Sequence, residues 1–349
     1  MNDKILNEIL DKDNFSSDEL KSLLELGEKH QVEMLFNRAD LLRKNYFGDE
    51  IHLRGVIEIS NYCRKNCNYC GLRDENYTIK RYRMEPDEII EIASQIAKLG
   101  IYTIVLKSGE DEKLDLDFIS YLIYSIKSHT NLAIMLSLGE RGFDEYKSWK
   151  IAGADRYILR HETCDKKKYS LYTNKQSFIN RVQHLKYLKR LGYQVGTGSL
   201  IGLPLQTIDD IIDDILLMKQ LDVDIASFAP FIPTPHTPYE NRPAGDVLTT
   251  LKAIAVARLV LKNTHIPATT SLDSLDFEGR EKGLNCGANV VMPDFTPQPY
   301  REKYLLYPQR RYSESDPISS HRNLRQRIEK LGRQISFSRG DSLKNSVNI

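Results

Sequence analysis

Apolar positions recur at helical spacing along the first 49 residues, and a different pattern begins at residue 51. Leu20, Leu23, Leu24 and Leu26 lie in the N-terminal stretch, followed by a second amphipathic run around 32–42. This periodicity predicts amphipathic helices. We therefore expect residues 1–49 to form a helical N-terminal segment.

From residue 51 onward, short apolar runs alternate with longer amphipathic ones. The short runs predict eight β-strands: Leu53–Ser60, Thr103–Lys107, Ala133–Leu138, Arg156–Arg160, Gln194–Leu200, Asp224–Ala229, Ala268–Ser271 and Asn289–Met292. The amphipathic runs predict seven helices: Pro86–Leu99, Leu116–Lys127, Asp144–Ile151, Ser177–Leu191, Thr207–Leu221, Leu248–Lys262 and Phe277–Cys286. A strand followed by a helix, repeated, indicates an α/β fold with parallel strands. Eight such units over residues 50–296 fit a (β/α)8 TIM barrel, with a doubly wound open sheet as the alternative.

The alternation stops after residue 296, and the remaining residues 297–349 are expected to be a C-terminal extension that closes the barrel and ends in a basic tail. Residues 310–349 hold nine Lys or Arg and four Asp or Glu. For this tail we expect a solvated helix over Asn323–Leu331 and a frayed, serine-rich end.

Composition and charge narrow the class of partner. The 349 residues are 41% hydrophobic and 28% charged, and 49 Lys or Arg against 48 Asp or Glu give a net charge of +1. Such a balance lacks the basic excess of nucleic-acid binders and of proteins bound to anionic membranes, so a small-molecule ligand is expected. No apolar run reaches the roughly 18 residues that span a membrane. We expect a cytoplasmic protein without a nucleic-acid or membrane partner.

Three of the five cysteines, Cys63, Cys67 and Cys70, lie within eight residues with the spacing C-x3-C-x2-C. Three thiolates so close together can bind one metal centre, and an iron–sulfur cluster with three protein ligands leaves one iron open for another ligand. Two alternatives are a Cys3His zinc site that uses a distant histidine such as His161, and incidental thiols. Cys164 lies apart from this cluster and is expected to be a passive small residue.

The chemistry of such barrels occurs in the loops at the carboxyl ends of the strands. The three cysteines follow the first predicted strand. Further polar residues follow or end later strands: Ser108, Gly109 and Glu110 after the second, His161 and Glu162 after the fourth, and Thr269, Thr270 and Ser271 at the end of the seventh. All of these residues are expected to face one mouth of the barrel.

The cysteine spacing, with the aromatic residue Tyr69 before the last cysteine, resembles that of the radical S-adenosylmethionine (SAM) superfamily. This resemblance implies one [4Fe–4S] cluster with three cysteine ligands and SAM as a second cofactor bound to the open iron. In that family one electron from the cluster breaks a C–S bond of SAM and releases a 5′-deoxyadenosyl radical. The cofactors carry the radical chemistry, and the barrel orients them.

The same resemblance implies which residues contact SAM. The segment SGED, with Ser108, Gly109 and Glu110, is similar to the one that contacts the methionyl amino group, and Glu162 in LRHET to the acid that contacts the ribose. Arg181 is the candidate for the methionyl carboxylate, since a guanidinium can bind it through two hydrogen bonds. The stretch GSLIGLP resembles the one that packs around the adenosine, and the remaining candidate cofactor contacts are Tyr69, Arg160 and Met292. The alternatives are a simple salt bridge between elements for Glu162 and Arg181, and a core position for Met292.

A longer series of motifs resembles the HydE-type [FeFe]-hydrogenase maturases within this superfamily. CRKNCNYCGLR, KRYRM, VLKSGED, LSLGE, GADRYILRHET, GLPLQTIDDIIDD, FIPTPHTP, IPATTS, CGANVVMP and PYREKYLLYP occur in this order, and the resemblance extends over about residues 1–310. It implies a role in building the diiron subcluster of the hydrogenase on a small anionic iron–cysteine–carbonyl–cyanide precursor. It also implies an electron donor such as ferredoxin or flavodoxin, and contact with other maturases.

Candidate substrate contacts follow from the same motifs: Ser137, Thr269, Thr270, Tyr304 and Tyr307, with Arg160 to neutralise charge. Tyr304 and Tyr307 are expected either to close the lower opening of the barrel or only to pack its floor. No cysteine follows Cys286, so the accessory cluster of some family members is not expected. His161 is expected to be a hydrogen-bonded supporting group rather than a general base. The alternatives are a methylornithine synthase, which would act on an amino-acid-derived substrate, a biotin-synthase-like enzyme that inserts sulfur, and a non-enzymatic iron–sulfur carrier or scaffold.

Overall fold

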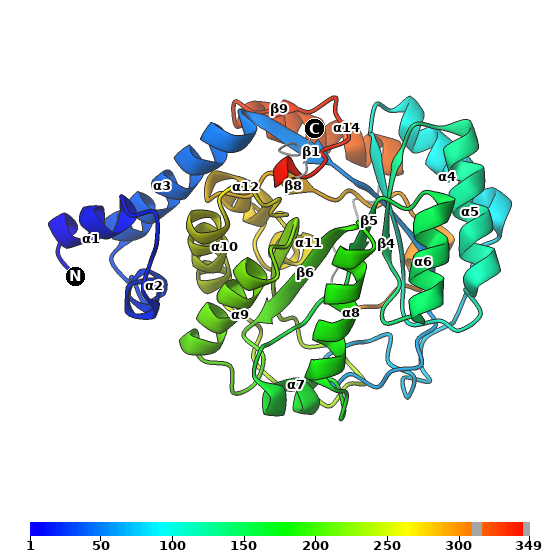
Figure 1. Ribbon diagram of the computed structural model, residues 1–349, viewed down its shortest axis with the longest axis horizontal. Helices are drawn as coiled ribbons and strands as arrows, with labels where there is room; N and C mark the ends of the chain where they lie inside the picture. The colour runs from blue at the N-terminus through cyan, green and yellow to red at the C-terminus, as the bar shows by residue number, and fades with distance from the viewer. Residues whose placement is uncertain (309–315, 345–349) are drawn as a thin grey trace.

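The computed structural model describes residues 1–308 and 316–344, and its centre is a sheet of six parallel strands (Figure 1). The strands lie in chain order: β2 Gly55–Ser60, β3 Thr103–Ser108, β4 Ala133–Ser137, β5 Arg156–Ile158, β6 Gln194–Ile201 and β7 Ile225–Pro230. Their residues are largely apolar and buried, as expected for parallel strands covered on both faces. The predicted α/β fold with parallel strands is confirmed.

Three shorter strands and several single bridges continue the sheet beyond β7 toward its first strand. β1 Glu50–Leu53 pairs in parallel with β8 Val290–Val291 and with β9 Gln334–Ile335. Single parallel bridges join Ile225 to His265, Pro267 to Val290, and Val56 to Asp294. These bridges connect β7 to β8 and β8 back to β2, so the strands surround a central space.

The seventh predicted strand, Ala268–Ser271, is wrong. Thr269 is the N-cap of helix α11 Thr270–Leu275, and Asp273 lies in the first turn of that helix. The Thr269 side chain makes no capping hydrogen bond, but threonine is a favoured N-cap residue and an acid in the first turn interacts favourably with the helix dipole. Only the residues just before, at His265 and Pro267, keep single bridges to the sheet.

Helices cover the outside of the strands. All seven predicted helices are confirmed within two residues at their termini: α4 Pro86–Lys98, α5 Leu116–His129, α6 Phe143–Ala152, α8 Phe178–Arg190, α9 Ile208–Gln220, α10 Val247–Leu261 and α12 Gly279–Asn285. Two further short helices were not predicted, α7 Lys166–Tyr172 and α13 Gln298–Arg301. No helix within the described part of the chain is long and apolar enough to cross a membrane.

The N-terminal segment forms three helices, as its periodicity predicts: α1 Asp3–Leu10, α2 Ser17–Leu24 and α3 Lys29–Phe47. Helices α2 and α3 pack against α10, at the left of Figure 1. This cover explains why α10 is buried on nearly every side. Residues 1–49 therefore add a second layer of helices on one side of the sheet.

The C-terminal segment covers the end of the barrel opposite the cysteine loop. Helix α14 Pro317–Lys330 is followed by β9 and by residues 336–344, which lie beside β1 (Figure 1). The Thr103 hydroxyl and the Arg156 guanidinium both donate to the Arg339 carbonyl at 2.8 Å, and the Ser342 hydroxyl donates to Asp224 at 2.5 Å. The expectation of a frayed end is wrong for residues 334–344, because buried polar groups of the barrel floor bind them. The basic residues within 309–315, and residues 345–349, lie outside the described part of the chain.

Candidate active site

Cys63, Cys67 and Cys70 lie on the loop that follows β2, and none of them forms a disulfide. The Glu110 amide donates to the Cys63 sulfur at 3.4 Å, and the side-chain amide of Gln176 donates to the Cys67 sulfur at 3.5 Å. The three thiols are partly exposed and close enough to influence one another electrostatically. The structure thus brings the predicted cysteines together at the carboxyl end of the first barrel strand.

The environment of these thiols fits a bound iron–sulfur cluster. Burial, together with the neighbouring Cys63, raises the pKa of Cys67 to about 12. Burial and the same neighbours also raise the pKa of Cys70. Three thiolates side by side repel one another unless a cation compensates them, and coordinated metal deprotonates such thiols. Three cysteine sulfurs on one loop are the donor set that an iron–sulfur cluster with an open iron requires.

Backbone contacts hold the cysteine loop in place. The Arg81 guanidinium donates to the carbonyls of Asn61 at 2.6 Å and Leu72 at 2.9 Å, which lie on either side of the cysteines. A Cβ atom on Gly71 would lie 2.1 Å from the Leu305 carbonyl oxygen, so only glycine fits there. The chain around Leu305, which precedes α14, therefore packs directly on the cysteine loop.

Glu110 connects the loop after β3 with the cysteine loop. Its carboxylate accepts from the Glu140 amide at 2.8 Å and lies 3.4 Å from Arg64 Nε and from Lys65 Nζ. A Cβ on the preceding Gly109 would lie 2.3 Å from the Tyr62 carbonyl oxygen, so glycine allows the two loops to touch. Ser108, Gly109 and Glu110 thus lie beside the cysteines, at the mouth that the sequence predicts.

Glu162 lies opposite, after β5, in a strained conformation. Its φ angle is 61°, a left-handed conformation that costs about 1–2 kcal/mol for a residue other than glycine. Its Oε1 accepts a hydrogen bond from the Tyr69 hydroxyl at 3.2 Å and lies 3.1 Å from Arg160 Nε. Arg160 Nη2 is buried and has no hydrogen-bond partner. A buried guanidinium nitrogen without a partner is a place where an anionic ligand would be stabilised.

Arg181 on α8 does not pair with Glu162. Its Nε donates to Glu140 Oε1 at 2.7 Å, and its Nη1 donates to the Arg160 carbonyl at 2.8 Å. The positive charge of Arg181 lowers the pKa of Cys67, although burial outweighs this effect. Arg181 is therefore near the cysteine loop, paired with Glu140, a residue after β4 that was not among the predicted site residues.

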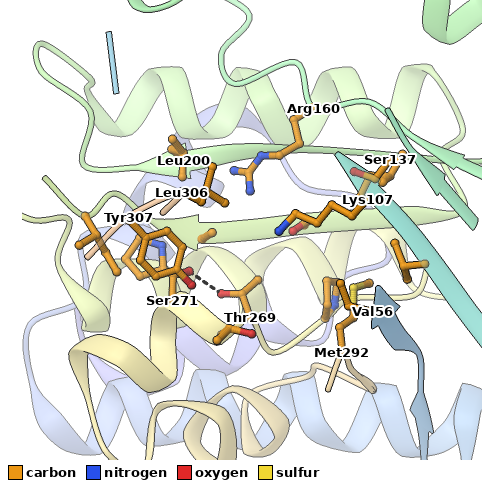
Figure 2. Close-up of a pocket in the computed structure, with 18 of the residues that line it drawn as sticks. Val56, Lys107, Ser137, Arg160, Leu200, Thr269, Ser271, Met292, Leu306 and Tyr307 are labelled. Atoms are coloured by element: carbon orange, nitrogen blue, oxygen red, sulfur yellow. Dashed lines mark hydrogen bonds between the residues drawn. The ribbon is translucent and has the colours of Figure 1, made fainter. Parts of the chain in front are cut away.

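A cavity of about 260 Å³ lies inside the strands. Figure 2 shows the side chains of Arg160 and Lys107, both of which line it, with their charged ends pointing in the same general direction. Lys107 Nζ lies 3.2 Å from Glu58 Oε1, and both residues line the cavity. The end near Val56 and Met292 is apolar and is lined by Val56, Val105, Met135, Ile158 and Met292. The cavity therefore combines an apolar surface with two cationic side chains.

Most of the predicted substrate contacts line this cavity. Ser137, Thr269, Thr270 and Tyr307 do so, and the hydroxyls of Thr269 and Ser271 share a hydrogen bond of 3.0 Å. Tyr304 is buried outside the lining, with its ring 5.0 Å from Lys107 Nζ.

The expectation that Tyr304 and Tyr307 close the lower opening is wrong. Leu306, between them, accepts a hydrogen bond from the Gly71 amide at 3.0 Å, next to Cys70. This segment is held on the cysteine side because the C-terminal extension returns across that loop. The opposite end is covered instead by residues 336–344.

Comparison with known proteins identifies the family. The family model described as the radical SAM superfamily matches residues 57–218. The [FeFe] hydrogenase maturase subunit HydE of Thermotoga maritima is 48% identical over 301 residues, 86% of this chain and 86% of that protein. This chain belongs to the radical SAM superfamily and is a homologue of HydE.

Other radical SAM proteins are also similar. A 3-methylornithine synthase of Methanosarcina acetivorans is 31% identical over 291 residues, 83% of this chain and 82% of that protein. The crystal structure of methylornithine synthase (PylB) superposes with a TM-score of 0.85 at 29% identity, over 95% of this chain and 97% of that one. Membership of the radical SAM superfamily implies that SAM and a [4Fe–4S] cluster are the cofactors, and homology to HydE connects the chain with hydrogenase maturation and a small-molecule substrate.

Sequence reasoning missed four residues of this radical SAM site: Glu58, Lys107, Glu140 and Gln176. Glu58 and Lys107 are direct partners in the register of β2 and β3. One charged residue in each of two neighbouring apolar strands was a usable signal, because a charge buried inside parallel strands needs a partner or a ligand. Gln176 lies just before α8, and no local pattern in the sequence marks it.

Proposed function

We propose that this protein is a HydE-type [FeFe]-hydrogenase maturase that acts on a small anionic iron–cysteine–carbonyl–cyanide species during assembly of the diiron subcluster. The observation that carries this proposal is the cavity behind the cysteine loop, where Arg160 Nη2 is buried without a hydrogen-bond partner. Lys107 supplies a second positive charge at the same cavity. Lys107 is paired with Glu58, and Arg160 with Glu162. The unpartnered N–H groups of Arg160 Nη2, together with the apolar wall, are therefore what suit a small anion with apolar ligands.

Cys63, Cys67 and Cys70 would hold a single [4Fe–4S] cluster, which supplies the electron for reductive cleavage of SAM. Glu110 beside Cys63 would bind the methionyl amino group, and Arg181 the methionyl carboxylate. The carboxylate of Glu162, fixed by Tyr69 and Arg160, would bind the ribose hydroxyls.

Ser137, Thr269, Thr270 and Tyr307 would contact the substrate, because their side chains line the cavity. Tyr304 would act on it only through Lys107, and Met292 would cover the apolar end of the chamber. An electron donor such as ferredoxin or flavodoxin would reduce the cluster from the exposed side of the cysteine loop. Transfer of the product to other maturases is part of the same proposal.

The test is anaerobic maturation of an apo [FeFe]-hydrogenase with the other maturases, SAM and a reductant, with and without this protein. Hydrogen evolution and 5′-deoxyadenosine are measured in the same tubes. Hydrogen evolution that depends on this protein and is lost in Cys67→Ser supports the proposal. If 5′-deoxyadenosine forms but the hydrogenase stays inactive while HydE works in parallel, the substrate is a different one, and methylornithine synthase activity is tested next.

The substitution Lys107→Met distinguishes substrate binding in the cavity from SAM binding at the cysteine loop. Lys107 lies on the cavity wall. It pairs with Glu58 and lies over the ring of Tyr304, and neither of these residues is assigned to SAM. We expect SAM affinity within twofold of the unmodified protein and a loss of hydrogenase activation by at least about tenfold, as removal of one charged contact to a buried anion predicts. Lys113→Met, a change at a lysine outside the cavity lining, is the matched control. Normal activation by Lys107→Met would contradict the assigned substrate chamber.

A further inference from the structure

A cluster of three largely buried polar side chains lies next to Glu162, and the proposed binding of SAM and substrate does not use it. It consists of His161, Cys164 and Asp214, the last of which lies on α9. The side chains of His161 and Asp214 are fully buried, with His161 Nε2 3.4 Å from Asp214 Oδ1. The same Oδ1 accepts a hydrogen bond of 2.7 Å from the Cys164 amide. Asp214 therefore contacts the chain on both sides of Glu162.

The other side of the His161 ring is held by Thr197 on β6. The Thr197 hydroxyl donates its one proton to the Leu159 carbonyl at 2.8 Å. Its oxygen lies 2.9 Å from His161 Nδ1, so Nδ1 must be the donor of that hydrogen bond. The ring is thus fixed by Thr197 at Nδ1, and its Nε2 is directed at Asp214.

The backbone between these contacts makes a tight turn. Glu162 has its left-handed φ of 61°, its amide donates to the Gly198 carbonyl at 2.9 Å, and the Thr163 amide donates back to the His161 carbonyl at 2.7 Å. A left-handed glutamate persists only where its surroundings fix it. Here the fixed points are His161 before it and Cys164 after it, and both converge on Asp214.

We propose that Asp214 is a positioning residue that, through His161 and the Cys164 amide, holds Glu162 in the left-handed turn that directs its carboxylate into the SAM site. This inference rests on the proposed role of Glu162 at the SAM ribose. Asp214 itself is on the outer helix and touches neither cofactor nor substrate. Within the described structure, Asp214 Oδ2 and His161 Nε2 both lack a hydrogen-bond partner, so Asp214 holds the turn by its hydrogen bond from the Cys164 amide and by its 3.4 Å contact with the His161 ring.

The same three side chains have their ligand atoms within 4.8 Å of one another, a spacing that a metal ion also requires. The positioning role is favoured because burial and the Asp214 carboxylate both raise the pKa of the Cys164 thiol. A protonated thiol is a poor metal ligand, since the thiolate is the form that binds. Metal analysis nevertheless belongs to the test.

The test is a double-mutant cycle on the cluster-loaded protein, with SAM affinity measured by anaerobic equilibrium dialysis. Asp214→Ala removes both contacts, whereas Asp214→Asn keeps the Oδ1 acceptor for the Cys164 amide and the contact of that oxygen with the His161 ring, and removes the negative charge. We expect SAM binding to weaken about tenfold in Asp214→Ala and to stay within about twofold in Asp214→Asn. Combined with Glu162→Gln, Asp214→Ala should add nothing further, because residues that act through one group are not additive.

Asp213→Ala, at an exposed neighbour on the same helix, is the matched control. Hydrogen exchange of the peptide that spans Leu159–Cys164 supplies a readout independent of SAM. It should be faster in Asp214→Ala and unchanged in Asp213→Ala, with the iron content and melting temperature of the Asn variant unchanged.

The outcomes distinguish the two proposals. Normal SAM affinity in Glu162→Gln overturns the role of Glu162 in the proposed function, and the positioning role falls with it. Weak affinity in Glu162→Gln with normal affinity in Asp214→Ala, or with additive effects in the double variant, overturns the positioning role alone. If metal analysis finds one equivalent of a metal other than cluster iron, and this metal is lost in His161→Gln, the positioning role of Asp214 is overturned in favour of a metal site.

Discussion

Arg156 on β5 ties the barrel floor to the C-terminal segment, and its removal should release that segment. The guanidinium is fully buried and donates to Thr103 Oγ1, the Arg339 carbonyl and Asp341 Oδ1 at 2.8 Å each, and to Gln194 Oε1 at 2.9 Å. Arg156→Met keeps the length of the side chain and removes all four donors. We expect the melting temperature to fall by about 4 °C.

The magnitude follows from what the substitution leaves behind. Removal of one partner of a buried ion pair costs about 3–5 kcal/mol. The Asp341 side chain is 48% exposed, so water can solvate its carboxylate after the change, and the lower end of about 3 kcal/mol applies here. An unfolding entropy of about 2.1 cal/mol/K per residue gives roughly 0.7 kcal/mol/K for a chain of this length, hence the shift of about 4 °C.

The assay is differential scanning calorimetry together with limited trypsin digestion followed by mass spectrometry of the C-terminal fragments. Arg156→Met should expose cleavage after Arg333 and Arg339, while SAM affinity stays unchanged because the cysteine loop lies at the other end of the barrel (Figure 1). Arg190→Met, at an exposed arginine, is the control and should change neither readout. A melting temperature within about 1 °C of the unmodified protein, with unchanged digestion, would refute the reasoning.

Three further predictions concern the cysteine loop and the floor. Gly71→Ala should force the loop away from the Leu305 carbonyl, 2.1 Å from the new Cβ, and lower the iron bound per chain; full iron content would contradict this close packing. Gln176→Leu removes the N–H donor to the Cys67 sulfur and should make the cluster's reduction potential more negative in an EPR-monitored redox titration; an unchanged potential would exclude that hydrogen bond in the loaded protein. Burial lowers the pKa of His52 from 6.5 to about 4, so the unfolded chain binds more protons in that window and stability falls as the pH drops from 7 to 5, by about 2 kcal/mol from this group. Urea titrations at both pH values should show a correspondingly smaller fall in His52→Gln, and an equal fall in both proteins would contradict the assignment.

The alternation of apolar runs predicted most of the fold because parallel strands are buried on both faces and therefore read as continuous apolar segments. It failed at Ala268–Ser271, where only Ala268 is apolar and where Thr269 and Asp273 provide helix-start signals. The cysteine site was also predictable, because its ligands lie close together in the sequence. A motif confined to one loop needs no knowledge of tertiary contacts.

The parts that escaped prediction depend on contacts between distant segments. Residues 334–344 have no apolar periodicity, and their position follows from buried donors such as Arg156, far away in sequence. The pairing of Arg181 with Glu140 likewise depends on where α8 crosses the end of β4. Lys107 and Glu58 were the exception, because their opposite charges stand in neighbouring apolar strands and could have been recognised as a pair.

The buried cations of this barrel divide into two groups with different consequences. At the floor, the hydrogen bonds of Arg156 are directed at barrel side chains and at the C-terminal segment, so its charge is already compensated. In the cavity, Arg160 has a nitrogen without a partner and Lys107 lies beside an apolar wall. Substitutions at the floor should therefore lower the melting temperature and leave SAM and substrate affinity intact. Substitutions of the two cavity cations should lower affinity as well as stability, because each removes the ion-pair partner of a buried carboxylate, Glu58 or Glu162. Because Arg160 is also the ion-pair partner of the buried Glu162 carboxylate, neutral replacement of Arg160 should lower the melting temperature while it abolishes activation of the hydrogenase.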